Sequence, residues 1–458
     1  MAENPTVLLT VYGGRSTSAG ASGDSARRGG GERMECGVTE NSAGSSHSKE
    51  SVVTLDKGLG ARLKRDFPLL RDSSIVFLDS AASAQKPEAV LDAQDRFYRA
   101  GYANIHRGVY ELSANATVQF DLVREKVAQL LNAQATEEII FTSGATESFN
   151  LVAYSWGRSQ LRVGDEIIVS LLEHHANFVP WQQLANEVGA KIKYVAPDQD
   201  GVLQLATVRE AITDRTRLVA VTALANAIGT ATPIKEIIDL SHAVGAVVVV
   251  DAAQSITHGR TDVQALDADF LAFSGHKLYG PTGTGVLYGK RKLLDLMPPF
   301  LTGGDMIVTV GVEGTTFAEP PHRFEAGTPN IAGIVGLGAA IDYFIAADPV
   351  QIEAYELFLV GELERKLAAV EGIRILGPIG RHRGLVTFVS DLVHPHDMAQ
   401  VLSSKQVAVR AGHHCAQPLM KHLGITASTR ASVALYTTEE DIDALVGGVQ
   451  AALSFFSR

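Results

Sequence analysis

The segment Phe270-Leu-Ala-Phe-Ser-Gly-His-Lys-Leu-Tyr-Gly-Pro281 decides the fold of this chain. Its apolar beginning, Phe270 to Phe273, predicts a buried strand that stops at Ser274-Gly-His-Lys277. A lysine just past a strand end, beside small hydroxyl and imidazole groups, suits an amine that loses its proton and attacks a carbonyl. Taken alone, the segment still favours a surface loop with a solvated lysine, because lysine is mostly exposed in proteins.

A second segment, upstream of the first, changes that balance. Ala246-Val-Val-Val-Val-Asp251-Ala-Ala-Gln254 predicts a strand buried on both faces, as in a parallel sheet. Asp251 then stands at the carboxyl end of the strand, where open α/β sheets place ligand-binding groups. A carboxylate there and a lysine one strand later are what a pyridoxal 5'-phosphate (PLP) site needs. The acid keeps the ring nitrogen protonated, and the lysine holds the aldehyde as a Schiff base.

The wider pattern agrees with such a sheet. From Glu138 to Pro281, predicted strands alternate with predicted helices. Repeated β-α-β units of this kind predict a parallel or mostly parallel sheet with helices on both faces.

Two motifs carry a family resemblance. Asp251-Ala-Ala-Gln254 followed by Ser274-Gly-His-Lys277 resembles the class V aminotransferase family of PLP enzymes. Arg410-Ala-Gly-His-His-Cys415-Ala-Gln-Pro-Leu-Met420 resembles the group II (Suf-type) cysteine desulfurases within it. The resemblance runs from about Phe67 to the C-terminus. It implies an α/β, PLP-dependent transferase of fold type I, with a mostly parallel central sheet and a smaller α/β C-terminal domain.

The chain divides into three parts. Residues 1–55 are crowded with Ser, Gly, Ala and Thr, and have too little apolar surface to offset the entropy of ordering, so we expect a disordered extension. We expect a large PLP-binding domain over residues 76–335. Residues 56–75 and 336–458 are expected to form a small domain that carries the catalytic cysteine loop.

Composition excludes several classes of protein. The chain has 458 residues and a formal net charge of −11, which argues against a nucleic acid partner. No apolar run reaches the roughly 18 residues of a membrane-spanning helix, so no membrane partner is expected. Cys36 and Cys415 lie far apart without a C-x-x-C pair. A disulfide framework is therefore not expected, and a reducing, cytoplasmic setting is.

The expected cofactor contacts come partly from local pattern and mostly from the resemblance. The turn Ser143-Gly-Ala-Thr146 before a helix presents N–H groups to a phosphate, although most such turns only cap helices. A lone histidine is more often structural, but the resemblance places His174 flat on the ring, where it also shuttles protons. The resemblance implies these further contacts: Gln254 on the ring O3′, Asn226 near O3′ or the substrate carboxylate, Ala145, Thr146, Ser274 and His276 at the phosphate, and Thr328 on the other subunit's phosphate.

The resemblance also assigns the substrate contacts. It implies that Arg430 holds the carboxylate of L-cysteine as a bidentate pair. Ala81 and Ala82 would present their backbone to the substrate, although Ser80 replaces the family's usual asparagine. Arg107 would lie at the interface of a homodimer, near the partner subunit's site. Without the resemblance, the segment around Arg107 would be taken as a solvated loop.

Cys415 selects the reaction. A lone cysteine is usually a small apolar core residue, but this one follows His413 and His414 in a polar loop. Consecutive residues rarely converge on one ion, so no metal site is expected. The resemblance implies that Lys277 takes the α-proton of L-cysteine and that the thiolate of Cys415 attacks the substrate sulfur. L-alanine leaves and a persulfide remains on Cys415.

The persulfide needs a recipient. Relatives pass it to a small sulfur-acceptor protein that feeds iron–sulfur cluster assembly. His394-Pro-His-Asp397 resembles the branch whose acceptor carries zinc, with His396 as the zinc-contacting residue on docking. The alternative is that both histidines are ordinary exposed loop residues.

Three other functions stay open from the sequence. A selenocysteine lyase uses nearly the same residues and differs in its preferred substrate. A class V aminotransferase would not need Cys415 and would pass its amino group to a keto acid. A non-catalytic PLP-fold scaffold would lack PLP absorbance.

Overall fold

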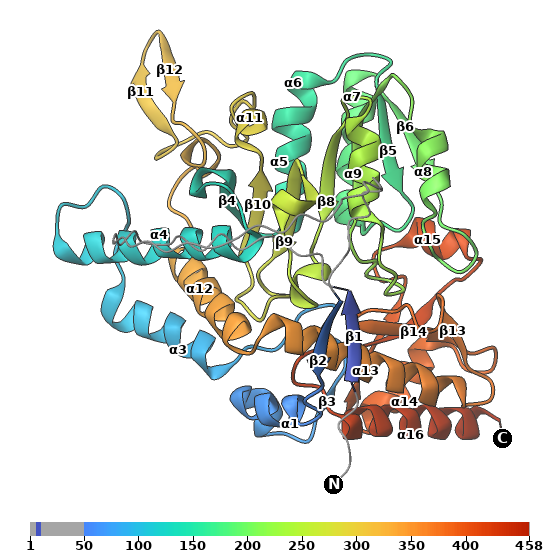
Figure 1. Cartoon of the computed structure of the whole chain (residues 1–458). Helices are drawn as coiled ribbons and strands as arrows, with labels where there is room; N and C mark the ends of the chain where they lie inside the picture. Colours follow the sequence, from blue (N-terminus) through green and yellow to red (C-terminus); the bar gives the residue numbers. More distant parts are fainter. Residues whose placement is uncertain (1–5, 11–49, 458) are drawn as a thin grey trace, which may run out of the picture.

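The computed structural model describes residues 6–10 and 50–457, and its larger part is built on one seven-stranded sheet (Figure 1). The strand order is β4-β10-β9-β8-β7-β5-β6. Only β10 runs antiparallel to its neighbours, so the predicted mostly parallel sheet is confirmed. The strands are β4 (Ile139–Thr142), β5 (Glu166–Ser170), β6 (Lys191–Val195), β7 (Thr216–Thr222), β8 (Val247–Asp251), β9 (Phe270–Ser274) and β10 (Gly285–Gly289).

Helices cover both faces of this sheet because its strands are apolar on both sides. In β8, Val248 and Val250 join one hydrophobic cluster and Val249 joins the other. The first face packs on α4 (Glu111–Leu131), α8 (Leu205–Ala211), α9 (Ile234–His242), α10 (Val263–Leu266) and α12 (Ile331–Ala346). The second packs on α5 (Ala145–Leu151), α7 (Val179–Val188) and α11 (Arg291–Leu294).

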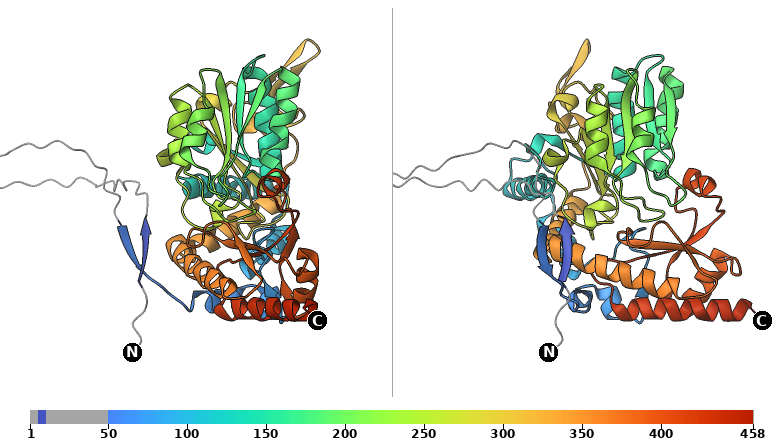
Figure 2. Two further views of the ribbon diagram at one scale, coloured as in Figure 1. Left: turned by 90° about the vertical axis from the view of Figure 1, so that its right-hand side faces the viewer. Right: turned by 45° about the vertical axis from the view of Figure 1, so that its right-hand side comes forward.

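A second, smaller sheet lies beneath the first in the orientation of Figure 2. Its four antiparallel strands have the order β13-β14-β17-β16. They are β13 (Arg374–Leu376), β14 (Leu385–Val389), β16 (Arg410–Gly412) and β17 (Ser428–Ser432). The helices of this region are α13 (Pro349–Ala368), α14 (Pro395–Ser404), α15 (Gln417–His422) and α16 (Glu439–Phe456).

The beginning of the folded body lies with this second sheet. The short helices α1 (Leu59–Leu63) and α2 (Pro68–Arg71) precede β3 (Val76–Phe77), which pairs in parallel with β15 (Val407–Ala408). The chain then passes to the large sheet through α3 (Glu88–Arg96). This pairing places the segment before residue 75 beside the C-terminal region.

Two extended features stand outside the main layers. The long connection between β10 and α12 contains a protruding hairpin of β11 (Ile307–Gly311) and β12 (Gly314–Phe317) (Figure 1). Near the N-terminus, β1 (Thr6–Thr10) pairs antiparallel with β2 (Glu50–Thr54). These two segments depart from the expected disorder of residues 1–55, because both are rich in β-branched residues that favour strands. The rest of that expectation, and Cys36, lie outside the described residues.

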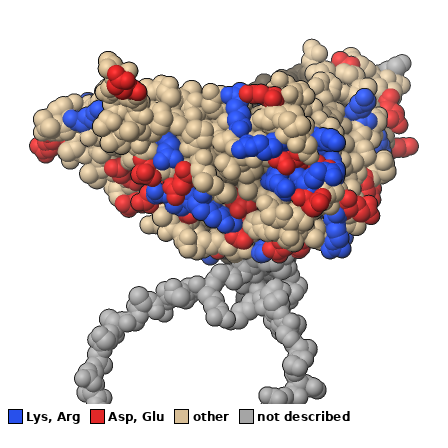
Figure 3. Space-filling model, turned by 90° about the horizontal axis from the view of Figure 1, so that it is seen from above, with Lys and Arg blue, Asp and Glu red and all other residues tan. Residues whose placement is uncertain are grey.

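The apolar helix α12 lies in the core, and charged side chains lie on the surface (Figure 3). Among the described residues, no single helix is long and apolar enough to cross a membrane. Only α12 and α13 together reach that length and composition, and they are bent by 75°. The apolar side of α12 is buried in the core. On the face shown in Figure 3, acidic and basic side chains are intermingled over short distances.

Candidate active site

A cavity of about 160 Å³ lies between the two sheets, at the carboxyl ends of the parallel strands. The large domain and the segment after β3 supply one wall, and the cysteine loop and β17 supply the other. The cavity brings together most of the residues expected from the sequence: Ala81, Ala82, Ala145, Thr146, His174, Asn226, Asp251, Ser274, His276, Lys277, Cys415 and Arg430.

Asp251 and Lys277 stand at the ends of the adjacent parallel strands β8 and β9. Asp251 is buried, and its Oδ1 accepts a hydrogen bond from the Ala253 N–H at 2.8 Å. Burial raises the pKa of Asp251, and Lys277 opposes that shift. Burial lowers the pKa of Lys277 to about 8, with Asp251 raising it and Arg430 lowering it further. The amine therefore loses its proton far more readily than an exposed lysine.

These two groups fit the PLP cofactor. Among the described residues, neither the Asp251 carboxylate nor the Lys277 amine makes an ion pair within 4 Å. A buried acid and a readily deprotonated amine, both facing one cavity, are the donor set that a protonated ring nitrogen and an aldehyde require.

The start of α5 also lines the cavity, through Ala145 and Thr146. The Ser274 hydroxyl accepts a hydrogen bond from the Ala145 N–H at 2.9 Å, which ties the end of β9 to this helix. His276 lies beside them, and burial and Lys277 lower its pKa to about 4. Neutral hydroxyl, imidazole and N–H groups gathered there suit an anionic phosphate.

His174 is held as a neutral ring. Its Nδ1 accepts a hydrogen bond from the Ala176 N–H at 3.0 Å, so the ring proton is on Nε2. Burial, and then Lys277, lower the pKa of His174 to about 4. Its ring therefore presents one fixed N–H donor at neutral pH.

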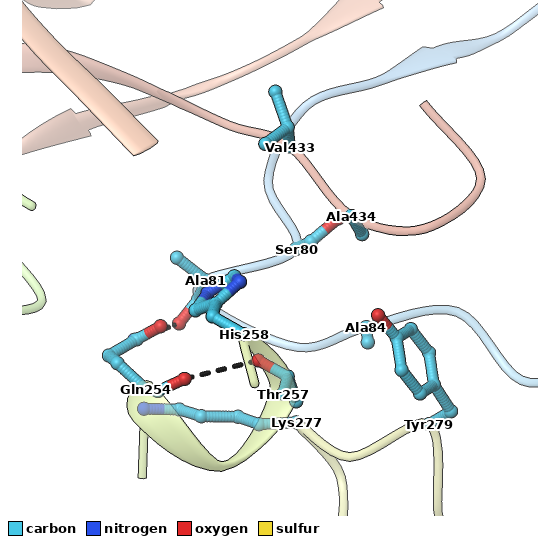
Figure 4. A pocket seen from close by; sticks show the side chains of 10 residues that line it. All are labelled: Ser80, Ala81, Ala84, Gln254, Thr257, His258, Lys277, Tyr279, Val433 and Ala434. Atoms are coloured by element: carbon cyan, nitrogen blue, oxygen red, sulfur yellow. Dashed lines mark hydrogen bonds between the residues drawn. The ribbon is translucent and has the colours of Figure 1, made fainter. Parts of the chain in front are cut away.

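Gln254 lies differently from the expectation. It lines a smaller cavity of about 10 Å³ together with Lys277, Thr257 and His258 (Figure 4). Its Nε2 donates to the Ala81 carbonyl at 2.8 Å. This bond fixes the Ala81 backbone against the large domain, and the expected contact with the ring O3′ stays a prediction.

The small domain contributes Arg430 and Cys415. Arg430 is buried and donates through Nη1 to the Asn226 carbonyl at 2.7 Å, while its Nη2 lies 3.5 Å from Asp79 Oδ1. Burial lowers the pKa of Arg430 to about 10, and Asp79 opposes the shift. The Asn226 amide donates to the His414 carbonyl at 2.6 Å, so it supports the cysteine loop. Cys415 is exposed and free, and it lines the cavity that holds Lys277.

Three expected residues lie away from this cavity. Arg107 pairs with Asp305 at 2.8 Å and its side chain is 62% exposed. Thr328 is exposed as well. Both were expected to act on a partner subunit, so their roles stay predictions. His396 is exposed at the start of α14, with its ring stacked on His394 at 5.4 Å.

Sequence reasoning missed two groups. Glu173 is fully buried and accepts hydrogen bonds from the Thr222 N–H at 2.7 Å and from Asn177 Nδ2 at 2.6 Å. Burial and the nearby Asp251 raise its pKa well above the usual value. Asp79 lies between Arg430 and Arg410, which contacts it at 3.2 Å. The sequence feature that could have pointed to Glu173 is its position, because it is an acidic residue shortly after the end of the buried strand β5.

Comparison with known proteins agrees with this geometry. The family model of class-V aminotransferases matches residues 76–445. A cysteine desulfurase from Cronobacter sakazakii is 50% identical over 393 residues, which cover 85% of this chain and 97% of the relative.

Solved structures give the same family. The cysteine desulfurase CsdA from Escherichia coli is 44% identical, with a TM-score of 0.82 over 87% of this chain and 99% of that one. A cysteine desulfurase from Thermococcus onnurineus is 38% identical, with a TM-score of 0.84 over 88% and 100%. The chain therefore belongs to the class-V aminotransferase family, whose members depend on PLP.

Proposed function

We propose that this protein is a cysteine desulfurase that converts L-cysteine to L-alanine and keeps the sulfur as a persulfide on Cys415. The relatives that share half or nearly half of its aligned residues are named as cysteine desulfurases. The observation that carries the proposal is the position of Cys415. Its exposed thiol lines the same cavity as Asp251, Lys277 and Arg430, so a bound amino acid contacts both the amine and the nucleophile.

The residues that line the cavity have different roles in the proposed reaction. Arg430 binds the substrate carboxylate, and its bonds to the Asn226 carbonyl and Asp79 hold the guanidinium in place. PLP, when bound through Lys277 and Asp251, withdraws electrons from the substrate α-carbon. The Lys277 amine, whose pKa is about 8, takes the α-proton. The Nε2–H of His174 is available to donate a proton on the same side of the site.

Sulfur transfer then balances without an added oxidant. The Cys415 thiolate attacks the substrate sulfur, a sulfur–sulfur bond forms, and the carbon–sulfur bond breaks with its electron pair on carbon. Protonation of that carbon gives L-alanine. The sum is L-cysteine plus the Cys415 thiol giving L-alanine plus the Cys415 persulfide.

Mass spectrometry of the PLP-loaded protein tests this assignment. After L-cysteine is added, Cys415 should gain one sulfur atom, and a reductant should reverse the gain. Cys415→Ala should keep the PLP absorbance and lose sulfide release. Preserved release by that variant would count against the role of Cys415. Faster turnover of selenocysteine than of cysteine would favour a selenocysteine lyase. Amino transfer to a keto acid would favour a class V aminotransferase, and absence of PLP absorbance would favour a non-catalytic scaffold.

We propose that the enzyme is a homodimer. Apolar side chains are exposed in the region of α3 and α4 and on the β11–β12 hairpin: Tyr98, Tyr102, Val109, Tyr110, Val308, Val310 and Val312. Exposed apolar side chains that gather on one part of a surface are typical of protein–protein contact. Arg107 and Thr328 lie outside their own subunit's cavity, as residues that serve the partner would. Light scattering should give twice the chain mass, and mixing Thr328→Ala with Lys277→Ala should restore part of the activity.

The remaining proposals concern the protein's setting. We propose that residues 76–335 and residues 56–75 with 336–458 act as two domains; the two separate sheets support this division, while the pairing of β3 (Val76–Phe77) with β15 places the first residues of the large domain with the small one. The persulfide passes to a sulfur-acceptor protein for iron–sulfur cluster assembly, with His396 at the docking site of a zinc-type acceptor. Equal stimulation of His396→Ala and wild type by such an acceptor would exclude that contact. A free reactive thiol suits a reducing cytoplasm, which cell fractionation can check.

A further inference from the structure

The loop that carries Cys415 holds two consecutive residues in the left-handed conformation. The φ angle is 51° at His414 and 55° at Cys415, although neither is glycine. Residues in such sparsely populated regions are strained and persist only where their surroundings over-determine them. The contacts around this turn therefore decide where the thiol lies.

Three of the hydrogen bonds around the turn are made by His414 and Cys415 themselves. The His414 carbonyl accepts from Asn226 Nδ2 at 2.6 Å, and the Cys415 carbonyl accepts from the His175 N–H at 2.8 Å. Both bonds tie the loop to the large domain. The His414 imidazole is 6% exposed, and its Nε2 lies 3.0 Å from Ser428 Oγ on β17. That side chain fastens the loop to the strand that also carries Arg430.

The neighbours of Ser428 assign the proton on His414. The Met420 sulfur, 3.9 Å from Ser428 Oγ, is an acceptor for the hydroxyl hydrogen, and we assign the His414 ring proton to Nε2, which then donates to the serine oxygen. Nδ1 is then a buried lone pair without a partner among the described residues. Burial, and then Arg430 and Arg410, lower the pKa of His414 to about 3. The ring is a neutral anchor with one directed donor.

We propose that His414 is a positioning residue, whose Nε2–H bond to Ser428 holds Cys415 in its left-handed conformation with the thiol in the active-site cavity. The side chain, rather than the backbone preference of residue 414, supplies the constraint. The expected effect of His414 on kcat rests on the proposed function, whereas its expected effect on the order of the loop does not.

Hydrogen exchange of the PLP-loaded protein tests the structural part. A glutamine at 414 places an amide N–H where Nε2 lies, whereas asparagine favours the left-handed conformation but cannot reach Ser428. His414→Ala and His414→Asn should exchange the amides of the 413–417 loop about tenfold faster, which is the effect of losing one hydrogen bond. His414→Gln, and His413→Ala at the exposed neighbour, should exchange like wild type.

Persulfide formation tests the kinetic part. In the alanine and asparagine variants, kcat for L-cysteine should fall about tenfold while KM stays within about twofold, because Arg430 still binds the carboxylate. Exchange of the loop amides at the wild-type rate in His414→Ala would overturn the proposal. Slow exchange of these amides in His414→Asn together with fast exchange in His414→Gln would also overturn it. If His414→Ala does not fold, Ser428→Ala removes the acceptor and carries the same expectations. If wild type forms no persulfide, the proposed function fails and hydrogen exchange still decides the role of His414.

Discussion

Replacing Lys277 by methionine should stabilise the cofactor-free protein at neutral pH. Burial lowers the pKa of this amine from 10.5 to about 8, so below pH 8 the folded protein holds a proton that its surroundings disfavour. The difference between 10.5 and about 8 corresponds to about 3 kcal/mol. This figure is an upper bound, because the amine faces the cavity. Methionine keeps most of the side-chain volume and carries no charge.

The sign of the effect follows from where the amine titrates. Below pH 8 the amine is charged in both the folded and the unfolded chain, and the full gain from Lys277→Met is present. Between pH 8 and 10.5 the folded amine is neutral while the unfolded one is charged, so the gain declines. Above pH 10.5 both are neutral and the gain is lost.

Thermal unfolding of the protein after removal of PLP measures this. For about 400 ordered residues, 3 kcal/mol corresponds to a rise in Tm of about 4 °C. The rise should appear at pH 7 and vanish near pH 10.5. Lys191→Met, on the exposed edge strand β6, is the matched control and should change Tm at neither pH. A lower Tm for Lys277→Met at pH 7, or the same shift at both pH values, would refute the reasoning.

Three further predictions concern the charged groups of the site. Asp251→Asn should lower kcat for L-cysteine at least about 100-fold while PLP still absorbs, because it removes the charge that holds the ring nitrogen protonated; an unchanged kcat would contradict that role. Arg430→Lys should raise KM about 10- to 100-fold by losing the bidentate pair, with the fold unchanged by circular dichroism. Glu173→Gln should change the free energy of unfolding by less than about 1 kcal/mol, because burial and Asp251 raise the pKa of Glu173 and favour a neutral side chain that the amide can replace; a loss of about 1–3 kcal/mol in denaturant unfolding would show that Glu173 is ionised and accepts from both Asn177 and Thr222.

The sequence predicted the parts of the site that depend on strand ends. The valine run of β8 and the apolar start of β9 placed Asp251 and Lys277 at one edge of the sheet, because parallel strands end together. The direction of β10 was not predictable in this way. Its residues, Gly285–Gly289, are apolar and buried like those of its neighbours, and periodicity carries no information on strand direction.

The long-range hydrogen bonds could also not be predicted from the sequence. The Gln254 amide donates to the Ala81 carbonyl, a backbone group far away along the chain, and its expected contact with the cofactor stays a prediction. Glu173 is held by the Thr222 N–H, and a backbone donor leaves no mark in the residue pattern. The left-handed turn at Cys415 depends on Asn226 and Ser428 in the same way. Local patterns give residue types and faces, whereas tertiary contacts fix orientation.

The site is assembled from two sheets, with the amine and the acid on one and the thiol and the guanidinium on the other. Under the proposed transfer of sulfur to an acceptor protein, an acceptor that docks on the small domain would approach Cys415 from the wall of the cavity opposite Asp251 and Lys277, without contacting those two residues. Recruitment of the acceptor and the chemistry at the α-carbon are then separate targets for engineering. Substitutions on the outer side of the small domain should retune delivery of sulfur while the spectrum of the bound cofactor stays the same.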